Sequence, residues 1–206
     1  LDDLEDFFRA EDVGVLVQSS SSGRGDYGAL MATGIRSARF PTRARPLPEI
    51  ILATEHYNRI VRIIDEYREP ATMEVEIRTE FYDKDQRGYN VVAEIPGTDK
   101  KNEIVMLGGH IDSWSPGTGA ADDAAGVAVS MEAVRVLKAL GVKPRRTIRV
   151  VLWSAEEKGW VGSKTYVANH FADVETMTLK PEHAKVSAYF NYDNGSGKIR
   201  GVHLQG

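Results

Sequence analysis

Residues 103–126 read EIVMLGGHIDSWSPGTGAADDAAG, and this stretch joins an apolar run to a glycine-rich segment with one histidine and three aspartates. The run up to His110 has the length and the aliphatic content of a buried strand. A helix is expected to begin near residue 123, because Asp123 stands where an acidic side chain favours a helix start. The stretch therefore predicts that the end of a buried strand places His110 close to Asp122 and Asp123.

The same alternation of strand and helix continues outward from this stretch. Further strands are predicted at residues 89–97, 147–155 and 186–193, and helices at 123–140 and 159–170. Near-continuous apolar strands that alternate with helices are typical of a parallel sheet covered by helices on both faces. The sequence therefore predicts an α/β fold, a three-layer sandwich with a central, mostly parallel sheet.

The first part of the chain has a different pattern. It predicts a strand at 12–18, a helix at 55–68 and a half-exposed strand at 73–81. In that helix an apolar stripe is expected to face the core, and it consists of Tyr57, Ile60, Val61, Ile64 and Tyr67. The turn-rich segment 83–88 breaks the pattern, so we predict two domains, residues 1–82 and 83–206.

The composition excludes several classes of protein. The chain carries 26 basic and 30 acidic residues, a net charge of −4, which disfavours binding to a nucleic-acid backbone. It has no cysteine, so disulfides and thiolate ligands are excluded. No apolar run reaches the length of a membrane-spanning helix. Because the chain runs from Leu1 to Gly206 without an initiating methionine, we expect it to be a piece of a longer protein.

Acidic residues stand at the ends of several predicted strands. Glu156 and Glu157 follow the strand at 147–155, and Asp193 ends the strand at 186–193. Functional groups gather at the carboxyl ends of strands in parallel sheets. We therefore expect these carboxylates to meet His110 and Asp122 at one edge of the sheet.

A cluster of one imidazole and several carboxylates suits a divalent metal. Without a cation the acids would raise one another's pKa, whereas zinc accepts both donor types, and two zinc ions can share a carboxylate at a separation of roughly 3.5–4 Å. One of Glu156 and Glu157 could bind metal while the other accepts a proton from water. Asp112 could hold the second ring nitrogen of His110. Taken singly, each residue also has an ordinary structural role, as a hydrogen-bonded histidine, a helix cap or a surface acid.

Four motifs in this order resemble the co-catalytic di-zinc exopeptidases, and most of all the carboxypeptidase Q branch: GGHIDSW, GTGAADDAAG, WSAEEKGWVGS and NYDNGSG, all between residues 89 and 197. The resemblance implies a mixed, eight-stranded α/β catalytic domain. It also implies a hydrolase that cleaves peptide bonds at chain termini or in dipeptides. Residues 1–82 resemble the latter part of a β-rich protease-associated domain, which is inserted into such enzymes.

The resemblance also implies a role for each matching residue. His110 and Asp193 would bind one zinc, Glu157 would bind a second, and Asp122 would bridge the two. Glu156 would be the general base. Asp112 would be the partner of His110, and the peptide bond between Asp122 and Asp123 would be cis.

One ligand of the family pattern has no match in the chain. The zinc held by Glu157 needs a further histidine, and His203 follows Asp193 by only ten residues, which is too short a spacing. His170 and His183 lie between the motifs and match nothing. We therefore expect an incomplete catalytic sheet, an incomplete second zinc site and little activity in this chain by itself.

Two other functions remain open on the same fold. A binding module or receptor without catalysis would have lost metal ligands, and a glutaminyl cyclase would bind a single zinc. The resemblance implies peptide or dipeptide substrates and a secreted, extracellular or periplasmic location, whereas the charge and the short apolar runs predict neither nucleic-acid binding nor a membrane span. It leaves open whether the whole protein is a homodimer.

Overall fold

The structure is a computed structural model, which describes residues 2–20, 31–34, 47–78, 80, 84–114, 117–173, 175–193 and 195–204. The chain divides into two compact units, Leu1–Asp83 and Lys84–Gly206.

The first unit contains a small sheet of three strands, and β3 lies between β1 and β2. Strand β1 is parallel to β3, and β2 is antiparallel to it. Buried apolar side chains around β3 include Leu47, Ile50 and Ala53. The described elements are α1 (Asp2–Ala10), β1 (Leu16–Ser19), β2 (Met31–Gly34), β3 (Pro48–Leu52) and α2 (Thr54–Asp65).

Two predictions for this unit are wrong. Helix α2 forms, but it has no fully buried residue: Ile64 is 47% exposed, and Tyr67, which follows the helix, is 67% exposed. Residues 73–78, the described part of the expected strand at 73–81, form no strand. Alternating polarity predicts which side chains face solvent, and Val75 and Ile77 are indeed half-buried, but it does not supply the partner strand that the hydrogen bonds of a sheet require.

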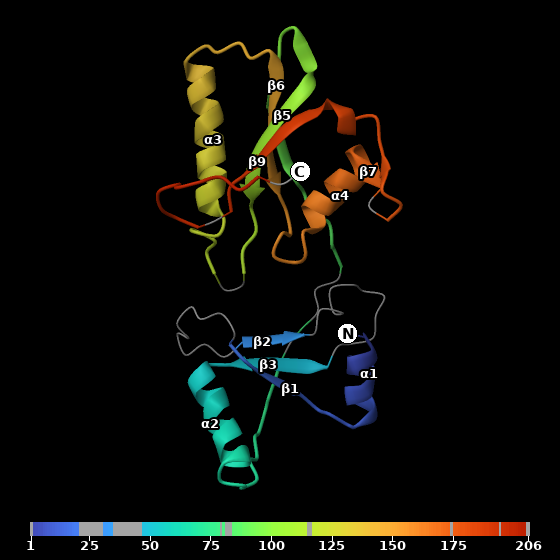
Figure 1. The fold of residues 1–206 in the computed structure, drawn as a ribbon, viewed down its shortest axis with the longest axis vertical. Helices are drawn as coiled ribbons and strands as arrows, with labels where there is room; N and C mark the ends of the chain where they lie inside the picture. Colours follow the sequence, from blue (N-terminus) through green and yellow to red (C-terminus); the bar gives the residue numbers. More distant parts are fainter. Residues whose placement is uncertain are drawn as a thin grey trace. The chain divides into compact units, whose positions relative to one another are not determined.

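The second unit is built on a sheet of four strands in the order β4-β6-β5-β9 (Figure 1). Strands β5, β6 and β9 are parallel, whereas β4 is antiparallel to β6, so the sheet is mixed. The principal elements are β4 (Val91–Ile95), β5 (Lys100–His110), α3 (Ala124–Ala139), β6 (Arg146–Trp153), α4 (Val161–His170) and β9 (Val186–Asn191). Three short elements lie between α4 and β9: β7 (Ala172–Asp173), β8 (Thr178–Leu179) and the 3-10 helix η2 (His183–Lys185).

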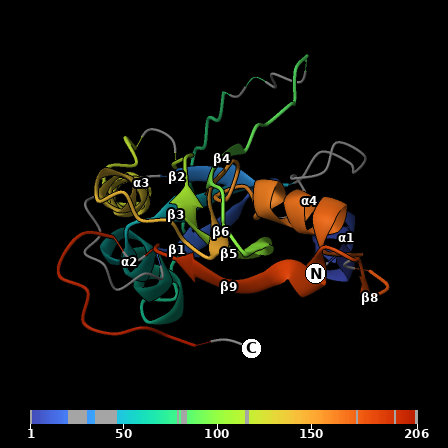
Figure 2. The same ribbon diagram turned by 90° about the horizontal axis from the view of Figure 1, so that it is seen from above.

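The two helices lie on either side of strands β5 and β6 (Figures 1 and 2). Successive side chains of a strand point to opposite faces. One face of the central strands packs against Tyr166 of α4 and against Phe171, and it carries Ile104, Met106, Val151 and Trp153. Gly109 belongs to the other face, where it lies close to Asp123 at the start of α3.

Strand β4 departs from the expected pattern of strands buried on both faces. Its side chains Val91 and Val92 are 51% and 46% exposed, and it is the edge strand next to β6. The apolar run at 89–97 therefore predicts the strand but not its burial or its direction. The parallel strands β5, β6 and β9 end at the same edge of the sheet, which is where the acidic residues follow.

The apolar cluster between the sheet and α4 provides the first prediction. Met106 is 3% exposed inside this cluster, so we expect Met106→Ala to lower the free energy of unfolding by roughly 2–5 kcal/mol, through lost burial and the cavity left behind. All three tryptophans (Trp114, Trp153 and Trp160) belong to the second unit, so urea unfolding followed by tryptophan fluorescence reports on that unit.

Met131→Ala is the matched control, because Met131 is 56% exposed on α3 and its replacement should change the free energy by less than about 0.5 kcal/mol. Equal effects of the two substitutions would contradict the packing described for this cluster.

Candidate metal centre

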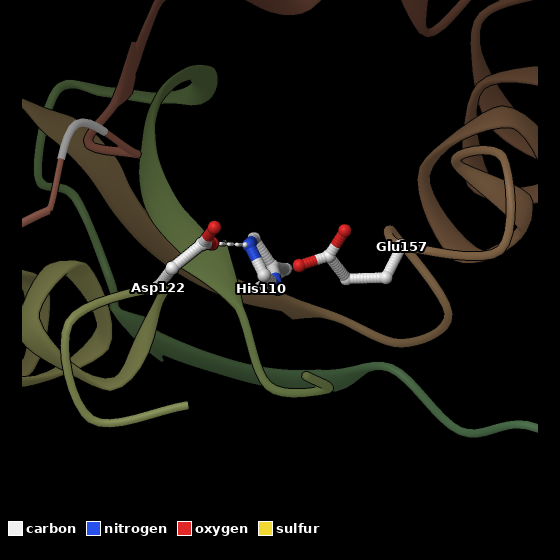
Figure 3. Close-up of side chains that lie close together, drawn as sticks. All are labelled: His110, Asp122 and Glu157. Carbon is white, nitrogen blue, oxygen red and sulfur yellow. Dashed lines mark hydrogen bonds and ion pairs between the residues drawn. The ribbon is translucent and has the colours of Figure 1, made fainter. Parts of the chain in front are cut away.

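His110 lies at the centre of the group of acidic side chains. It is the last residue of β5, it is 2% exposed, and its ring faces Asp122 and Asp193. Figure 3 shows Asp122 and Glu157 on either side of the His110 ring. Asp122 comes from the segment before α3, Glu157 from the turn after β6, and Asp193 from the segment after β9. The sequence prediction that strand ends bring these residues together therefore agrees with the structure.

The distances between these groups suit a bound cation. His110 Nε2 is 2.9 Å from Asp122 Oδ1 and 3.6 Å from Asp193 Oδ1. One possible ligand atom of each of His110, Asp122 and Glu157 lies within 4.8 Å of the others. Tetrahedral zinc with bonds of about 2.0–2.1 Å separates its ligand atoms by roughly 3.3 Å. Small side-chain movements would thus bring these donors within bonding distance of bound cations.

The other ring nitrogen of His110 decides what Nε2 can do. Nδ1 lies 2.9 Å from the main-chain oxygen of Asp112, which can only accept, so Nδ1 carries the hydrogen. Nε2 must then bear either a proton or a cation to face two carboxylates. Burial opposes the charged ring, but the hydrogen bond to Asp122 and the charge of Asp193 outweigh it and raise the pKa of His110. A metal ion at Nε2 would take the place of that proton.

Asp112 contacts the His110 ring through its main-chain oxygen and not through its carboxylate. Its carboxylate oxygen Oδ1 lies 3.6 Å from His110 Nδ1, beyond hydrogen-bond distance. Instead, the main-chain N–H of Glu156 donates to Oδ1 at 2.8 Å and that of Glu157 donates to Oδ2 at 3.1 Å. The main chain of Asp112 therefore orients His110, while its side chain fastens the turn that carries the two glutamates.

Asp123 is 1% exposed and both of its carboxylate oxygens accept hydrogen bonds. Oδ1 accepts from the main-chain N–H of Gly126, which caps α3, and Oδ2 accepts from that of His110 at 3.0 Å. Asp123 lies close enough to His110 and Asp193 to count as a metal ligand by distance alone. Because both oxygens are engaged, we assign it to holding the strand end against the helix start. The Asp122–Asp123 peptide is cis, as the resemblance implies.

The surroundings of Glu156 and Glu157 favour a bound cation. Glu157 Oε1 is buried and has no hydrogen-bond partner. Burial, with the nearby charges of Asp122 and Glu156, raises the pKa of Glu157. Burial likewise raises the pKa of Glu156 and that of Asp193. A buried, orphaned carboxylate oxygen beside other carboxylates fits a cation in this position.

Other residues border the centre. A cavity of about 140 Å³ adjoins His110 and is lined in part by Ile111, Thr118 and Val127. Lys158 Nζ lies 4.8 Å from the centre of the Trp114 ring, a cation–π contact between the loop after β5 and the turn after β6. Sequence reasoning did not single out this pair, and the only available signal was that both residues lie inside the motifs GGHIDSW and WSAEEKGWVGS.

The remaining histidines stay outside the centre. Neither close group of histidine and acidic side chains in the described ranges includes His203, His170 or His183. His203 is exposed, and His170 Nδ1 lies 3.1 Å from Glu182 Oε2 instead.

The contact between Gly109 and Asp123 provides a prediction. A Cβ atom on Gly109 would overlap Asp123 Oδ2 and lie 3.2 Å from the main-chain oxygen of Tyr192. Gly109→Ala should therefore push the Asp123 carboxylate away from the His110 N–H and lower the free energy of unfolding by roughly 1–3 kcal/mol.

Gly201→Ala is the control, since a Cβ there meets nothing within 4 Å and should not lower stability. Urea unfolding followed by tryptophan fluorescence measures both. A Gly109→Ala variant as stable as Gly201→Ala would contradict the close approach.

Comparison with known proteins gives the centre a context. The model of Peptidase family M28 matches residues 90–202, a range that includes every residue of the centre. Carboxypeptidase Q from Rattus norvegicus is 45% identical over 98 residues, which are 48% of this chain and 21% of that protein. The chain thus spans about a fifth of the length of this curated relative.

Solved structures agree with this result. The Peptidase M28 precursor from Shewanella amazonensis SB2B matches with a TM-score of 0.64 and 31% identity, over 90% of this chain and 39% of that one. A zinc aminopeptidase from Bacillus subtilis matches with a TM-score of 0.59 over 92% of this chain and 40% of that one, and at 20% identity it shows the fold alone. Since the family model covers more than half of the 206 residues, the chain belongs to peptidase family M28.

Proposed function

We propose that the protein containing this chain is a zinc-dependent exopeptidase that hydrolyses peptide bonds at chain termini or in dipeptides. The observation that carries the proposal is the buried ring of His110, whose Nε2 faces the carboxylates of Asp122 and Asp193 while Glu157 Oε1 lies buried without a partner. Membership in a peptidase family and the zinc aminopeptidase among the structures of the same fold support it.

The donor set fits two zinc ions. In this proposal His110 and Asp193 would hold one ion and Glu157 the other, and Asp122 would be a ligand of both. Imidazole nitrogen and carboxylate oxygen are common zinc ligands. When bound, zinc lowers the pKa of a water molecule and polarises the carbonyl of the scissile bond.

Glu156 acts as the general base. Its carboxylate accepts a proton from the attacking water as the new carbon–oxygen bond forms, and it donates that proton to the leaving amine as the carbon–nitrogen bond breaks. The main-chain N–H of Glu156 donates to Asp112, which fixes the backbone at this residue, and Glu156 belongs to neither close group of possible metal ligands among the described residues. The strand ends fix the positions of His110 and the other ligands. These ligands would in turn orient the reacting groups.

The wider architecture belongs to the same proposal. Residues 1–82 would be part of a protease-associated domain, and residues 83–206 part of a three-layer catalytic domain with further strands and a further histidine ligand. We propose a secreted, extracellular or periplasmic protein, with homodimerisation as an open property. Among the described residues, no helix combines the length and apolar character needed to cross a membrane.

The role of Glu156 can be tested in the full-length protein. Glu156→Gln keeps the shape of the side chain but cannot accept the proton, so kcat should fall by about 10²–10⁴-fold while the zinc content stays unchanged. The measurements are hydrolysis of unblocked dipeptides and amino-acid p-nitroanilides, and zinc per chain by mass spectrometry. Glu175→Gln is the control, because Glu175 is exposed and lies outside both candidate metal groups.

A chelator should abolish hydrolysis and added zinc should restore it.

Full activity of Glu156→Gln would remove Glu156 as the base. Two bound zinc ions without hydrolysis of either substrate class would refute the peptidase and favour a binding module. One tightly bound zinc would favour a glutaminyl cyclase.

A further inference from the structure

The turn between β6 and α4 carries both Glu156 and Glu157, and its backbone adopts conformations that need support. Ala155 and Trp160 have φ of 53° and 60°, and Gly159 has φ of 105°. Left-handed backbone is disfavoured for residues with a Cβ atom. A turn with several such residues holds its shape only when contacts from outside fix it.

The side-chain amide of Asn90 spans the two ends of this turn. Asn90 Oδ1 accepts the main-chain N–H of Ser154 at 3.0 Å, and Asn90 Nδ2 donates to the main-chain oxygen of Gly162 at 3.0 Å. The ends are also joined directly, because the Gly162 N–H donates to the Ser154 oxygen at 2.9 Å. Ser154 and Gly162 flank the glutamate pair in sequence, and these contacts hold the two residues together.

Asparagine is the residue that this position requires. The amide presents one acceptor and one donor on a single rigid plane, and the two main-chain groups need one of each. Aspartate has nearly the same shape but only accepts, so it would face the Gly162 oxygen with another oxygen. There is no spare room, since a Cβ atom on Gly162 would overlap both Ser154 O and Asn90 Oδ1.

The antiparallel edge strand explains how Asn90 reaches the turn. Val91, the first residue of β4, pairs with Leu152 of β6. Asn90 therefore stands opposite the last residue of β6, one position before the turn begins. Strand β4 contributes little buried surface, and its register is what delivers this amide to the site.

We infer that Asn90 is a positioning residue for Glu156 and Glu157. It fixes the ends of the turn, while Asp112 fixes the middle through the two glutamate N–H groups. Neither residue is among the proposed zinc ligands or the base. This inference rests on the proposed exopeptidase function, because it assigns to Asn90 the alignment of that base and that ligand.

The test compares Asn90→Ala and Asn90→Asp in the full-length protein loaded with zinc. Outer residues that orient metal ligands typically contribute 10–100-fold, so kcat for an unblocked dipeptide should fall on the order of 10- to 100-fold in Asn90→Ala. KM should change little, because Asn90 positions the catalytic groups and does not touch substrate. Asn90→Asp keeps the Ser154 contact but sets a carboxylate oxygen against the Gly162 oxygen, so its kcat should fall as well. The matched control is Asn102→Ala, at an exposed position of β5 distant from the turn in sequence.

Hydrogen exchange supplies a readout that does not depend on activity. In Asn90→Ala the amides of residues 154–162 should exchange faster than in the unchanged protein, while those of β6 should keep their protection. Unchanged kcat in Asn90→Ala, or faster exchange spread equally over β6 and the turn, would overturn the inference. If the unchanged protein hydrolyses no peptide, the proposed function fails, and selective exchange in the turn still decides whether Asn90 holds it.

Discussion

The contact between His110 Nδ1 and the main-chain oxygen of Asp112 sets the chemistry of the whole centre. A carbonyl oxygen only accepts, so the ring hydrogen stays on Nδ1, and Nε2 faces Asp122 and Asp193 with its lone pair unless a proton or a metal ion occupies it. The ring is 2% exposed and is held at both nitrogens, at Nδ1 by the Asp112 oxygen and at Nε2 by Asp122. The fold thus holds Nε2 of His110 against two carboxylates, and a bound cation would stabilise this arrangement.

The strands around this histidine serve to fix its neighbours. Strands β5, β6 and β9 are parallel and deliver His110, the Glu156–Glu157 turn and Asp193 to one edge of the sheet. Two aspartates fasten the edge from within: Asp123 ties the strand end to α3, and Asp112 ties it to the glutamate turn. Each uses its carboxylate on main-chain N–H groups, which leaves the remaining acids for the metal. Two acids thus support the backbone and the others are available to bind metal. The proposed catalysis depends on this division.

Much of this arrangement could be predicted from the sequence, because strand ends and helix starts have strong local signals. The apolar run before His110 and the acidic helix start at Asp123 predicted β5 and α3, and the order of the motifs predicted the meeting of His110, Asp122, Glu157 and Asp193. Pairing partners and directions depend on the rest of the chain, so the direction of β4 and the missing strand at 73–78 escaped prediction. Contacts through main-chain atoms escaped for a similar reason: Asp112 is expected beside His110, but the role of Asn90 and the use of the Asp112 carboxylate on the glutamate turn leave no distinct pattern in the sequence.

The central claim is that the donors around His110 hold zinc, and anomalous diffraction at the zinc absorption edge tests it most directly. Crystals of the full-length protein grown with zinc should show two anomalous peaks at zinc-ligand distances of about 2.0–2.2 Å. One should lie beside His110 Nε2 and Asp193, the other beside Glu157, with Asp122 between them and Asp123 bound to neither. No peak within bonding distance of His110 Nε2, or an ion bound by Asp123 in place of Asp122, would contradict the account.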